Sequence, residues 1–306
     1  MSSALPLHHH QFRAMGSRCE LWYYAPAEDN QQLLAAARQR LIQLENKYTR
    51  YRPDSITSRI NAASGNGEQI EVDSETVGLL HYAATLHEQS EGLFDITSGI
   101  LRRAWDFRSG CLPADADIEA LLPLIGWSNV HWQPPFFALP KAGMEIDFGG
   151  FVKEFAADQL GSVLRHRGVE HGLVNLGGDI SVIGPHPDGK PWMVGIQHPR
   201  EADHAIARIP MTHGAIATSG DYERYMLIGG KRYCHILNPF TGYPIQSPIA
   251  GATVVADQCL IAGSFTSLAL LKSETDPDWL KESGVAYLLV DQQMSLISNI
   301  QVADQS

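Results

Sequence analysis

A lysine follows a pair of glycines where a predicted strand gives way to a predicted helix. In the segment IDFGGFVKEFAADQL, Gly149 and Gly150 end the strand and Lys153 falls in the first turn of the helix. Free backbone N–H groups at a helix start, together with the helix dipole, favour phosphate oxygens, and Lys153 would add a full positive charge. The segment is a candidate phosphate site. A plain strand-to-helix turn, in which the glycines only relieve crowding, explains the same residues.

A second glycine pair separates two apolar strands in the segment NLGGDI. Here Asn175, Gly177, Gly178 and Asp179 occupy the connection. Glycines in such a place let a flat ligand or a phosphate approach the backbone closely. A tight hairpin or a β-bulge explains the segment equally well.

The segment GLFDITSGILRRAW places Asp95 and Thr97 just after an exposed helix end. Their side chains could hydrogen-bond the ring of a bound ligand, or they could cap the turn that follows. The sequence leaves both alternatives open.

The segment AIATSGDYERYMLIGGKRYCHILNPFTGYPI is unusually rich in polar groups for a hairpin and its following turn. A buried polar group must be hydrogen-bonded or it costs about 1 to 3 kcal/mol, so cores seldom gather so many. This concentration of polar residues indicates a functional site, although a lone histidine in a strand more often has a structural role. Its members are Thr218, Ser219, Asp221, Tyr222, Arg224, His235, Asn238, Pro239, Thr241 and Gly242.

The segment DQCLIAGSFTSLALLK predicts an apolar helix from Leu260 to Lys272. Positions 263 and 267 are one turn apart on the same face. They are Gly263 and Ser267, with no carboxylate at either. Taken alone, this pattern indicates a packed helix whose small residues permit close approach.

The elements that must hold these residues follow from periodicity. An apolar stripe at steps of three and four predicts a helix carrying Leu33, Leu34, Ala37, Leu41, Leu44 and Tyr48. A strand is expected from Gln11 onward and a buried strand over Met144 to Phe148, whereas TRYRPDSITSRIN is expected to be a polar loop. A second helix is expected over Val152 to Arg167.

The C-terminal half predicts many short strands separated by Gly, Pro or Asp, ending in the pair VAYLLV and MSLIS. Strands that come in runs, rather than alternating with helices, favour an α+β fold with largely antiparallel sheets. We expect one domain over residues 12–272, possibly as two intimate lobes, which residues 273–306 complete with a helix and strands. Residues 1–11, with His8, His9 and His10, are expected to be a flexible, solvated arm.

Composition restricts the class of partner. The 306 residues are 44% hydrophobic and carry a formal charge of -11, which allows a sizeable core but gives no overall positive field for nucleic acid or anionic membrane. No apolar run approaches the roughly 20 residues of a spanning helix, and the N-terminus lacks the apolar region of a secretory signal. The expected compartment is the cytoplasm, with the periplasm as the alternative if a leader was trimmed.

Taken in order, these segments resemble the ApbE family of FAD:protein FMN transferases. The resemblance covers almost the whole chain, from about Phe12 to Lys272, and depends on the ordered set rather than on any single piece. The matching segments are MGS near the start, TRYRPDSITSRIN, GLFDIT with Trp105 downstream, IDFGGFVKEFAAD, LVNLGGDISVIG, VGIQHP, ATSGDYERY, GGKRYCHILNP and AGSFTSLALL.

The resemblance implies an ApbE-like, T-fold-related, two-lobed architecture with FAD in a cleft between the lobes and Mg²⁺ at its pyrophosphate. It implies transfer of FMN onto a threonine hydroxyl of a redox flavoprotein, within a short Asp-containing motif, with release of AMP. His235 and Lys153 would be catalytic. The flavin site would comprise Met15, Tyr51, Asp95, Thr97, Lys153, Asn175, Gly177, Gly178, Asp179, Thr218, Ser219 and Gly220.

Two positions depart from the family's pattern. Many members have Lys-Gly where this chain has Lys153-Glu154, which puts a carboxylate either near the phosphate site or on the solvent side of the helix. The metal-binding pattern Ala-Asp-Ala-x-x-Thr maps its carboxylate and hydroxyl onto Gly263 and Ser267, so the usual Asp is absent. Another carboxylate, such as Asp257 or Asp179, could replace it, or the site could use a more hydrated ion. The alternative function is an FAD-binding or flavin-carrier protein without turnover.

Overall fold

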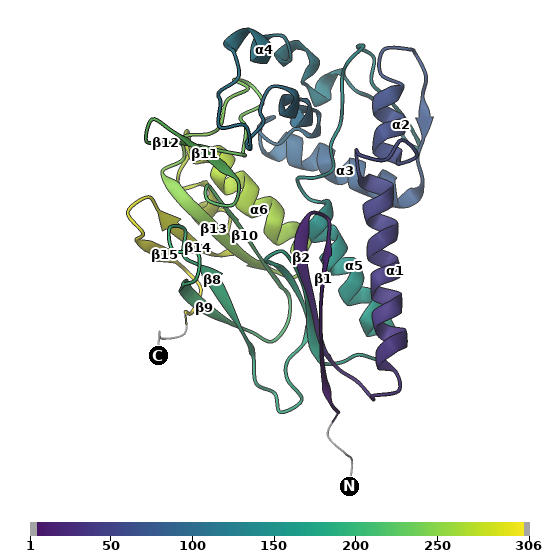
Figure 1. The fold of residues 1–306 in the computed structure, drawn as a ribbon, viewed down its shortest axis with the longest axis vertical. Helices are drawn as coiled ribbons and strands as arrows, with labels where there is room; N and C mark the ends of the chain where they lie inside the picture. The colour runs from purple at the N-terminus through teal and green to yellow at the C-terminus, as the bar shows by residue number, and fades with distance from the viewer. Residues whose placement is uncertain (1–4, 303–306) are drawn as a thin grey trace.

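An antiparallel eight-stranded sheet forms the centre of the molecule in the computed structural model, which describes residues 5–302 (Figure 1). Its strand order is β1-β2-β6-β7-β10-β13-β14-β15. The strands are β1 (Leu7–Ala14), β2 (Ser17–Tyr24), β6 (Gly172–Leu176), β7 (Asp179–Gly184), β10 (Ala215–Gly220), β13 (Ile249–Ala256), β14 (Ala286–Asp291) and β15 (Leu296–Ser298).

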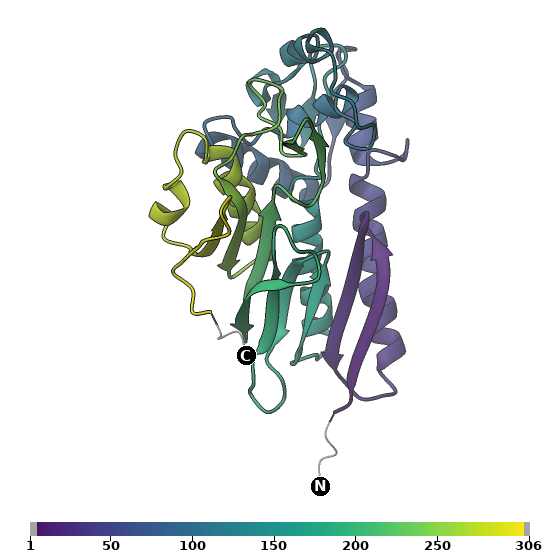
Figure 2. The same cartoon turned by 60° about the vertical axis from the view of Figure 1, so that its left-hand side comes forward.

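The two faces of this sheet are covered differently (Figures 1 and 2). Helices α5 (Val152–His166) and α6 (Cys259–Lys272) pack on one face, and α1 (Asn30–Tyr48) packs against α5. The hairpin of β8 (Trp192–Gln197) and β9 (Ala205–Met211) covers the other face. Because neighbouring strand residues point to opposite faces, Ala215 joins the helical core while Ile216 joins the hairpin side.

A second lobe stands at the top of Figure 1. Its elements are α2 (Ile56–Ala62), α3 (Ser74–Gln89), the 3₁₀ segments η1 (Ile96–Arg103), η2 (Leu122–Leu124) and η3 (Trp127–Asn129), α4 (Asp115–Glu119), and the strands β3 (Ile70–Glu71), β4 (His131–Gln133) and β5 (Phe136–Ala138). The hairpin of β11 (Tyr225–Ile228) and β12 (Lys231–Cys234) packs Met226 against Trp105 and Ile118 of this lobe. A short helix, α7 (Trp279–Glu282), precedes β14.

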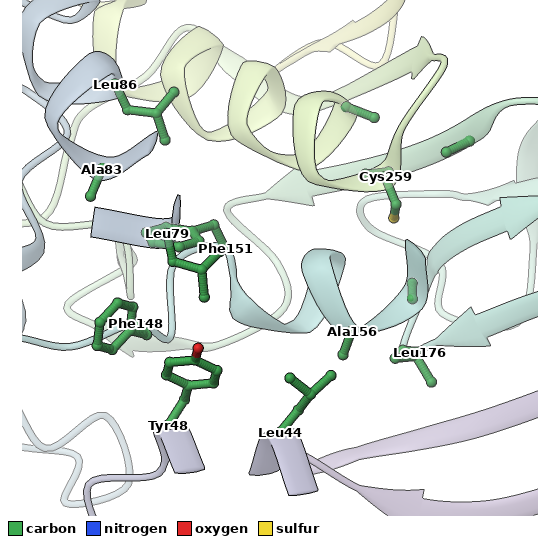
Figure 3. Close-up of a cluster of buried hydrophobic side chains, with 14 of the residues drawn as sticks. Leu44, Tyr48, Leu79, Ala83, Leu86, Phe148, Phe151, Ala156, Leu176 and Cys259 are labelled. Atoms are coloured by element: carbon green, nitrogen blue, oxygen red, sulfur yellow. The ribbon is translucent and has the colours of Figure 1, made fainter. Parts of the chain in front are cut away.

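One hydrophobic core runs through both lobes. Figure 3 shows Tyr48, Phe148 and Phe151 between the helices, with Leu176 and Cys259 toward the sheet. The rings of Phe148 and Phe151 meet edge to face at 6.0 Å between centroids, a favoured aromatic geometry. Phe151 is the residue just before α5. Its packed ring therefore fixes where the first turn of that helix begins.

The α+β fold with antiparallel sheets is confirmed. The stripe on α1 is buried at Leu33, Ala37, Leu41, Leu44 and Tyr48, as predicted, while Leu34 is only partly buried. Helices α5 and α6 begin and end within one residue of their predicted bounds.

The flexible arm expected over residues 1–11 is wrong for residues 7–11, which form most of β1. His9 stacks on Trp22 of β2 with ring centroids 3.4 Å apart, and His10 Nε2 lies 2.8 Å from Asn30 Oδ1. Three consecutive histidines do not alternate between apolar and polar residues, so hydrophobic periodicity could not predict this strand. Residues 1–4 and 303–306 lie outside the described residues.

Two other local predictions are wrong. Met144 to Phe148 is buried and alternating but is not a strand, because the Asn61 side chain, rather than a neighbouring strand, bonds both the N–H and the C=O of Ile146 at 2.7 and 3.0 Å. The segment TRYRPDSITSRIN is expected to be a loop, but the loop ends at Ser55 and α2 follows. The Ser55 hydroxyl accepts the Ser58 N–H and caps this helix.

Candidate functional site

An ion pair joins the start of α5 to the start of β7. Lys153 Nζ lies 2.5 Å from Asp179 Oδ2, and the Asp179 carboxylate also accepts the backbone N–H of Thr218. Burial alone would lower the pKa of Lys153, but the charges of Asp179 and Glu154 outweigh burial and raise it. Lys153 therefore carries its positive charge at neutral pH.

The turn between β6 and β7 lies against this lysine. Gly177 has φ +66°, and a Cβ added to it would lie 2.7 Å from the Ser17 Cβ and 3.7 Å from Lys153 Nζ. The side-chain oxygen of Asn175 accepts the Gly178 N–H at 2.8 Å and holds the turn. A Cβ on Gly178 would meet no atom within 4 Å, so the backbone here is open beside a cation.

The Glu154 side chain points inward and not to the solvent side of the helix. It is 9% exposed and lies against α6, where a Cβ on Gly263 would come within 2.5 Å of Glu154 Cγ and 3.0 Å of its Oε1. No N–H or hydroxyl group donates to the buried Glu154 Oε2, but the side chain is close enough to the Asp179 carboxylate for the two to share a hydrogen bond. Burial, followed by the nearby Asp179 charge, raises the pKa of Glu154 well above its usual range.

Hydroxyl groups from β10 and α6 complete this region. Ser219 Oγ lies 2.8 Å from Thr266 Oγ1, which also donates to the Gly263 carbonyl at 2.7 Å. The neighbouring Thr218 bonds Thr253 of β13 at 2.9 Å.

Gly220 and Gly251 pair across β10 and β13, and this leaves room for the Tyr222 ring. A Cβ on Gly220 would lie only 2.1 Å from Tyr222 Cε1. This glycine is therefore explained by packing.

His235 follows β12, and its imidazole is close enough to Lys153 to feel that charge. Burial first, then the positive charges of Arg224 and Lys153, lower the pKa of His235 to about 4. Its Nδ1 is buried without a hydrogen-bond partner. The ring is neutral at physiological pH and can accept a proton.

The turn between β1 and β2 reaches the same segment. Met15 has φ +48° and its N–H donates to Glu45 Oε1 at 2.7 Å, while a Cβ on Gly16 would lie 3.9 Å from Arg224 Nη2. The predicted residue Met15 therefore lies near the His235 segment.

Asp95 and Thr97 are occupied by the turn that they cap. Asp95 Oδ1 accepts the Thr97 N–H and hydroxyl at 2.8 and 2.6 Å, and Oδ2 accepts the Trp127 N–H at 2.8 Å. Thr97 Oγ1 in turn accepts the Gly126 N–H at 2.8 Å. The structure thus supports the capping alternative, and a role for these side chains at the flavin ring stays a prediction.

Tyr51 lies on the surface, with its side chain among the most exposed of the large hydrophobic residues, at 80%. Its hydroxyl accepts a hydrogen bond from Arg50, whose guanidinium also lies over the ring at 4.9 Å from the centroid. Arg50 pairs with Asp147, just before Gly149. Tyr51 is thereby linked to the Gly149-Gly150 turn before α5 and is available to stack on a flat ligand.

The metal prediction meets a different arrangement. Gly263 offers no side chain, and its carbonyl already accepts Thr266; Ser267 lies one turn further along α6 and is half-buried. Asp257 is exposed just beyond the end of β13, whereas Asp179 lies beside Glu154. Within residues 5–302, no group of three or more His, Cys, Asp or Glu residues is arranged to hold a metal ion.

Sequence reasoning named Glu154 but left the direction of its side chain open, and it did not name Thr266. The signal for Glu154 lay in the resemblance, which implies glycine at position 154 and Asp at position 263, where this chain has Glu154 and Gly263. Only the packing of α5 on α6 shows that the two positions meet.

Two surface pockets of about 190 and 210 Å³ lie beside Tyr24 and Cys234, and none of the predicted ligand residues lines either. In the part of the chain that the structure describes, no helix combines the length and apolar character needed to cross a membrane.

Comparisons with known proteins agree with this architecture. The ApbE family model matches residues 15–289. The FAD:protein FMN transferase of Vibrio cholerae is 30% identical over 241 residues, covering 76% of this chain and 72% of that protein. The protein of the same name from Haemophilus influenzae is 29% identical over 257 residues, covering 80% and 74%.

Solved structures show the same fold. The ApbE protein of Thermotoga maritima superposes with a TM-score of 0.87 at 28% identity, covering 96% of this chain and 97% of that one. The match spans both lobes and the loops that carry Lys153, Asp179 and His235. This chain belongs to the ApbE family.

Proposed function

We propose that this protein is an FAD:protein FMN transferase, which moves FMN from FAD onto a threonine hydroxyl of an acceptor flavoprotein and releases AMP. The names of its relatives support the activity. The observation that carries the proposal is the convergence of Lys153, the open Gly177-Gly178 turn and His235 from three distant parts of the sequence.

The reaction forms a bond between the threonine oxygen and the FMN phosphorus and breaks the bond from that phosphorus to the bridging oxygen. AMP leaves with that oxygen, and the hydroxyl proton passes to a base. Lys153 neutralises charge on the diphosphate, which is the main requirement of phosphoryl-type transfer. His235, neutral because of its lowered pKa, is the candidate proton acceptor.

The residues beside Lys153 fit a Mg²⁺ ion. Mg²⁺ prefers hard oxygen ligands, and the site gathers the carboxylates of Glu154 and Asp179 with the hydroxyls of Ser219 and Thr266. The observation that supports this fit is the close approach of two buried carboxyl groups, Glu154 and Asp179, because a cation between them would remove their repulsion. Glu154, Asp179 and Thr266 would hold the ion, which would supply further charge neutralisation at the diphosphate.

The competing function is flavin binding without turnover, and the missing side chain at Gly263 is the observation that favours it. The expected acceptor motif, a threonine among small residues with a nearby Asp, and the cytoplasmic location both stay predictions.

A single reaction separates the alternatives. Purified protein is mixed with FAD, Mg²⁺ and a flavoprotein fragment bearing such a threonine, and intact mass of the fragment and released AMP are measured together. The proposal predicts a fragment heavier by one FMN unit and an equal amount of AMP, with neither product when the threonine is replaced by alanine. Bound FAD without either product would support the carrier, and no retained FAD would contradict both.

A further inference from the structure

We propose that Glu154 supplies, from α5, the carboxylate that binds a divalent cation in this site, and that Gly263 is the residue on α6 that makes room for it. The inference rests on the proposed function for the purpose of the cation, but the binding of the cation can be measured separately.

The first argument is steric. The Glu154 side chain occupies the volume that any side chain at position 263 would need, with 2.5 Å from the added Cβ to Glu154 Cγ and 3.1 Å to its carboxyl carbon. Real Cβ atoms essentially never approach within 3.0 Å of such an atom. The site therefore accommodates a carboxylate from α5 or one from α6, but not both without movement.

The second argument is the state of the Glu154 carboxylate. It is nine-tenths buried and faces the buried Asp179 carboxylate closely enough for the two groups to share a hydrogen bond through one proton. Two facing carboxylates repel each other when both are ionised, and a bound cation would take the place of the shared proton. The neighbouring oxygens of Asp179 and Thr266 are of the same hard type.

The other nearby carboxylates are either hydrogen-bonded to backbone or exposed. Both oxygens of Asp158 accept backbone N–H groups at the start of α6, from Cys259 and Leu260, each at 2.9 Å. Asp257 is exposed beyond the end of β13. Glu223 also acts on Lys153 and Asp179, but this residue is exposed. Glu154 and Asp179 are the buried carboxylates of this region.

The test measures cation binding without any transfer. Mn²⁺ replaces Mg²⁺, and free Mn²⁺ is followed by electron paramagnetic resonance with and without FAD for the wild type, Glu154→Gln, Glu154→Gly and the exchange variant Glu154→Gly/Gly263→Asp. We expect Glu154→Gln to weaken Mn²⁺ binding at least tenfold. We expect the exchange variant to bind at least tenfold more tightly than Glu154→Gly, because the carboxylate introduced at position 263 would enter the vacated volume.

Circular dichroism and thermal unfolding of each variant show whether it is folded. Wild-type affinity in a folded Glu154→Gln protein would overturn the inference, as would an exchange variant that binds no better than Glu154→Gly. Mn²⁺ binding that depends on Glu154 in a protein that never transfers FMN would uphold this inference and contradict the proposed function. If the protein transfers FMN but its Mn²⁺ affinity does not depend on Glu154, the proposed function is upheld and this inference is contradicted.

Discussion

The contact between Glu154 and position 263 can be tested as a coupling free energy. Gly263→Ala introduces one methyl group, and its carbon would lie 2.5 Å from Glu154 Cγ, well inside normal van der Waals separation. Because Glu154 is buried, it has little freedom to swing away. Overpacking of this kind costs about 1 to 3 kcal/mol. Replacing a helical glycine with alanine otherwise gains about 1 kcal/mol.

The two terms separate in a double-mutant cycle with Glu154→Ala. In the Glu154→Ala background the clash is gone and only the gain of about 1 kcal/mol remains. In the wild-type background the cost of overpacking is added. The effect of Gly263→Ala on the free energy of unfolding should therefore differ between the two backgrounds by about 1 to 3 kcal/mol.

Urea unfolding of the wild type, both single variants and the double variant measures this difference directly, provided the slope with urea stays constant. Gly78→Ala is the matched control, because this glycine also lies in a helix but an added Cβ meets no atom within 4 Å. Additivity of the two changes within about 0.5 kcal/mol would refute the contact.

Three further predictions concern the predicted ligand residues. Lys153→Met should weaken FAD binding at least tenfold in a fluorescence titration, whereas Lys190→Met, which removes an exposed ion-paired lysine, should not; equal affinities would remove Lys153 from the diphosphate site. The pKa of His235 is about 4 in the folded protein and near 6.5 in the unfolded chain, so this group lowers the free energy of unfolding as pH drops from 6.5 to 4, by no more than about 3 kcal/mol. His235→Gln should flatten that part of the plot of unfolding free energy against pH. An unchanged plot would contradict the lowered pKa. Asp95→Ala should lower the free energy of unfolding by about 1 to 3 kcal/mol, because the N–H groups of Thr97 and Trp127 lose their acceptor; lost FAD affinity at full stability would instead assign Asp95 to the flavin.

Much of the fold follows from local patterns. The helix stripe from Leu33 to Tyr48, the strand pairs around Gly177 and the helix from Leu260 could be predicted because each pattern is set by one buried face. The strand through His8 to His10 could not, since its stability comes from stacking and hydrogen bonding with β2 and α1 rather than from its own hydrophobicity.

The candidate site was predictable as a set of loops but not as a geometry. Sequence reasoning named Lys153, Asp179 and His235 as candidates, yet it could not decide which way Glu154 pointed, because that depends on the angle at which α5 packs on α6. It also could not show that Asp95 is fully used as a cap, since one of its partners, Trp127, is 32 residues away.

The central claim is that separate loops hold the diphosphate of FAD at the first turn of α5. A crystal structure of the protein with FAD and Mg²⁺ tests it most directly. We predict the two phosphates between Lys153 Nζ and the Gly177-Gly178 turn, with the FMN phosphorus facing His235. FAD bound elsewhere, with no phosphate in contact with the Lys153–Asp179 ion pair, would contradict the claim.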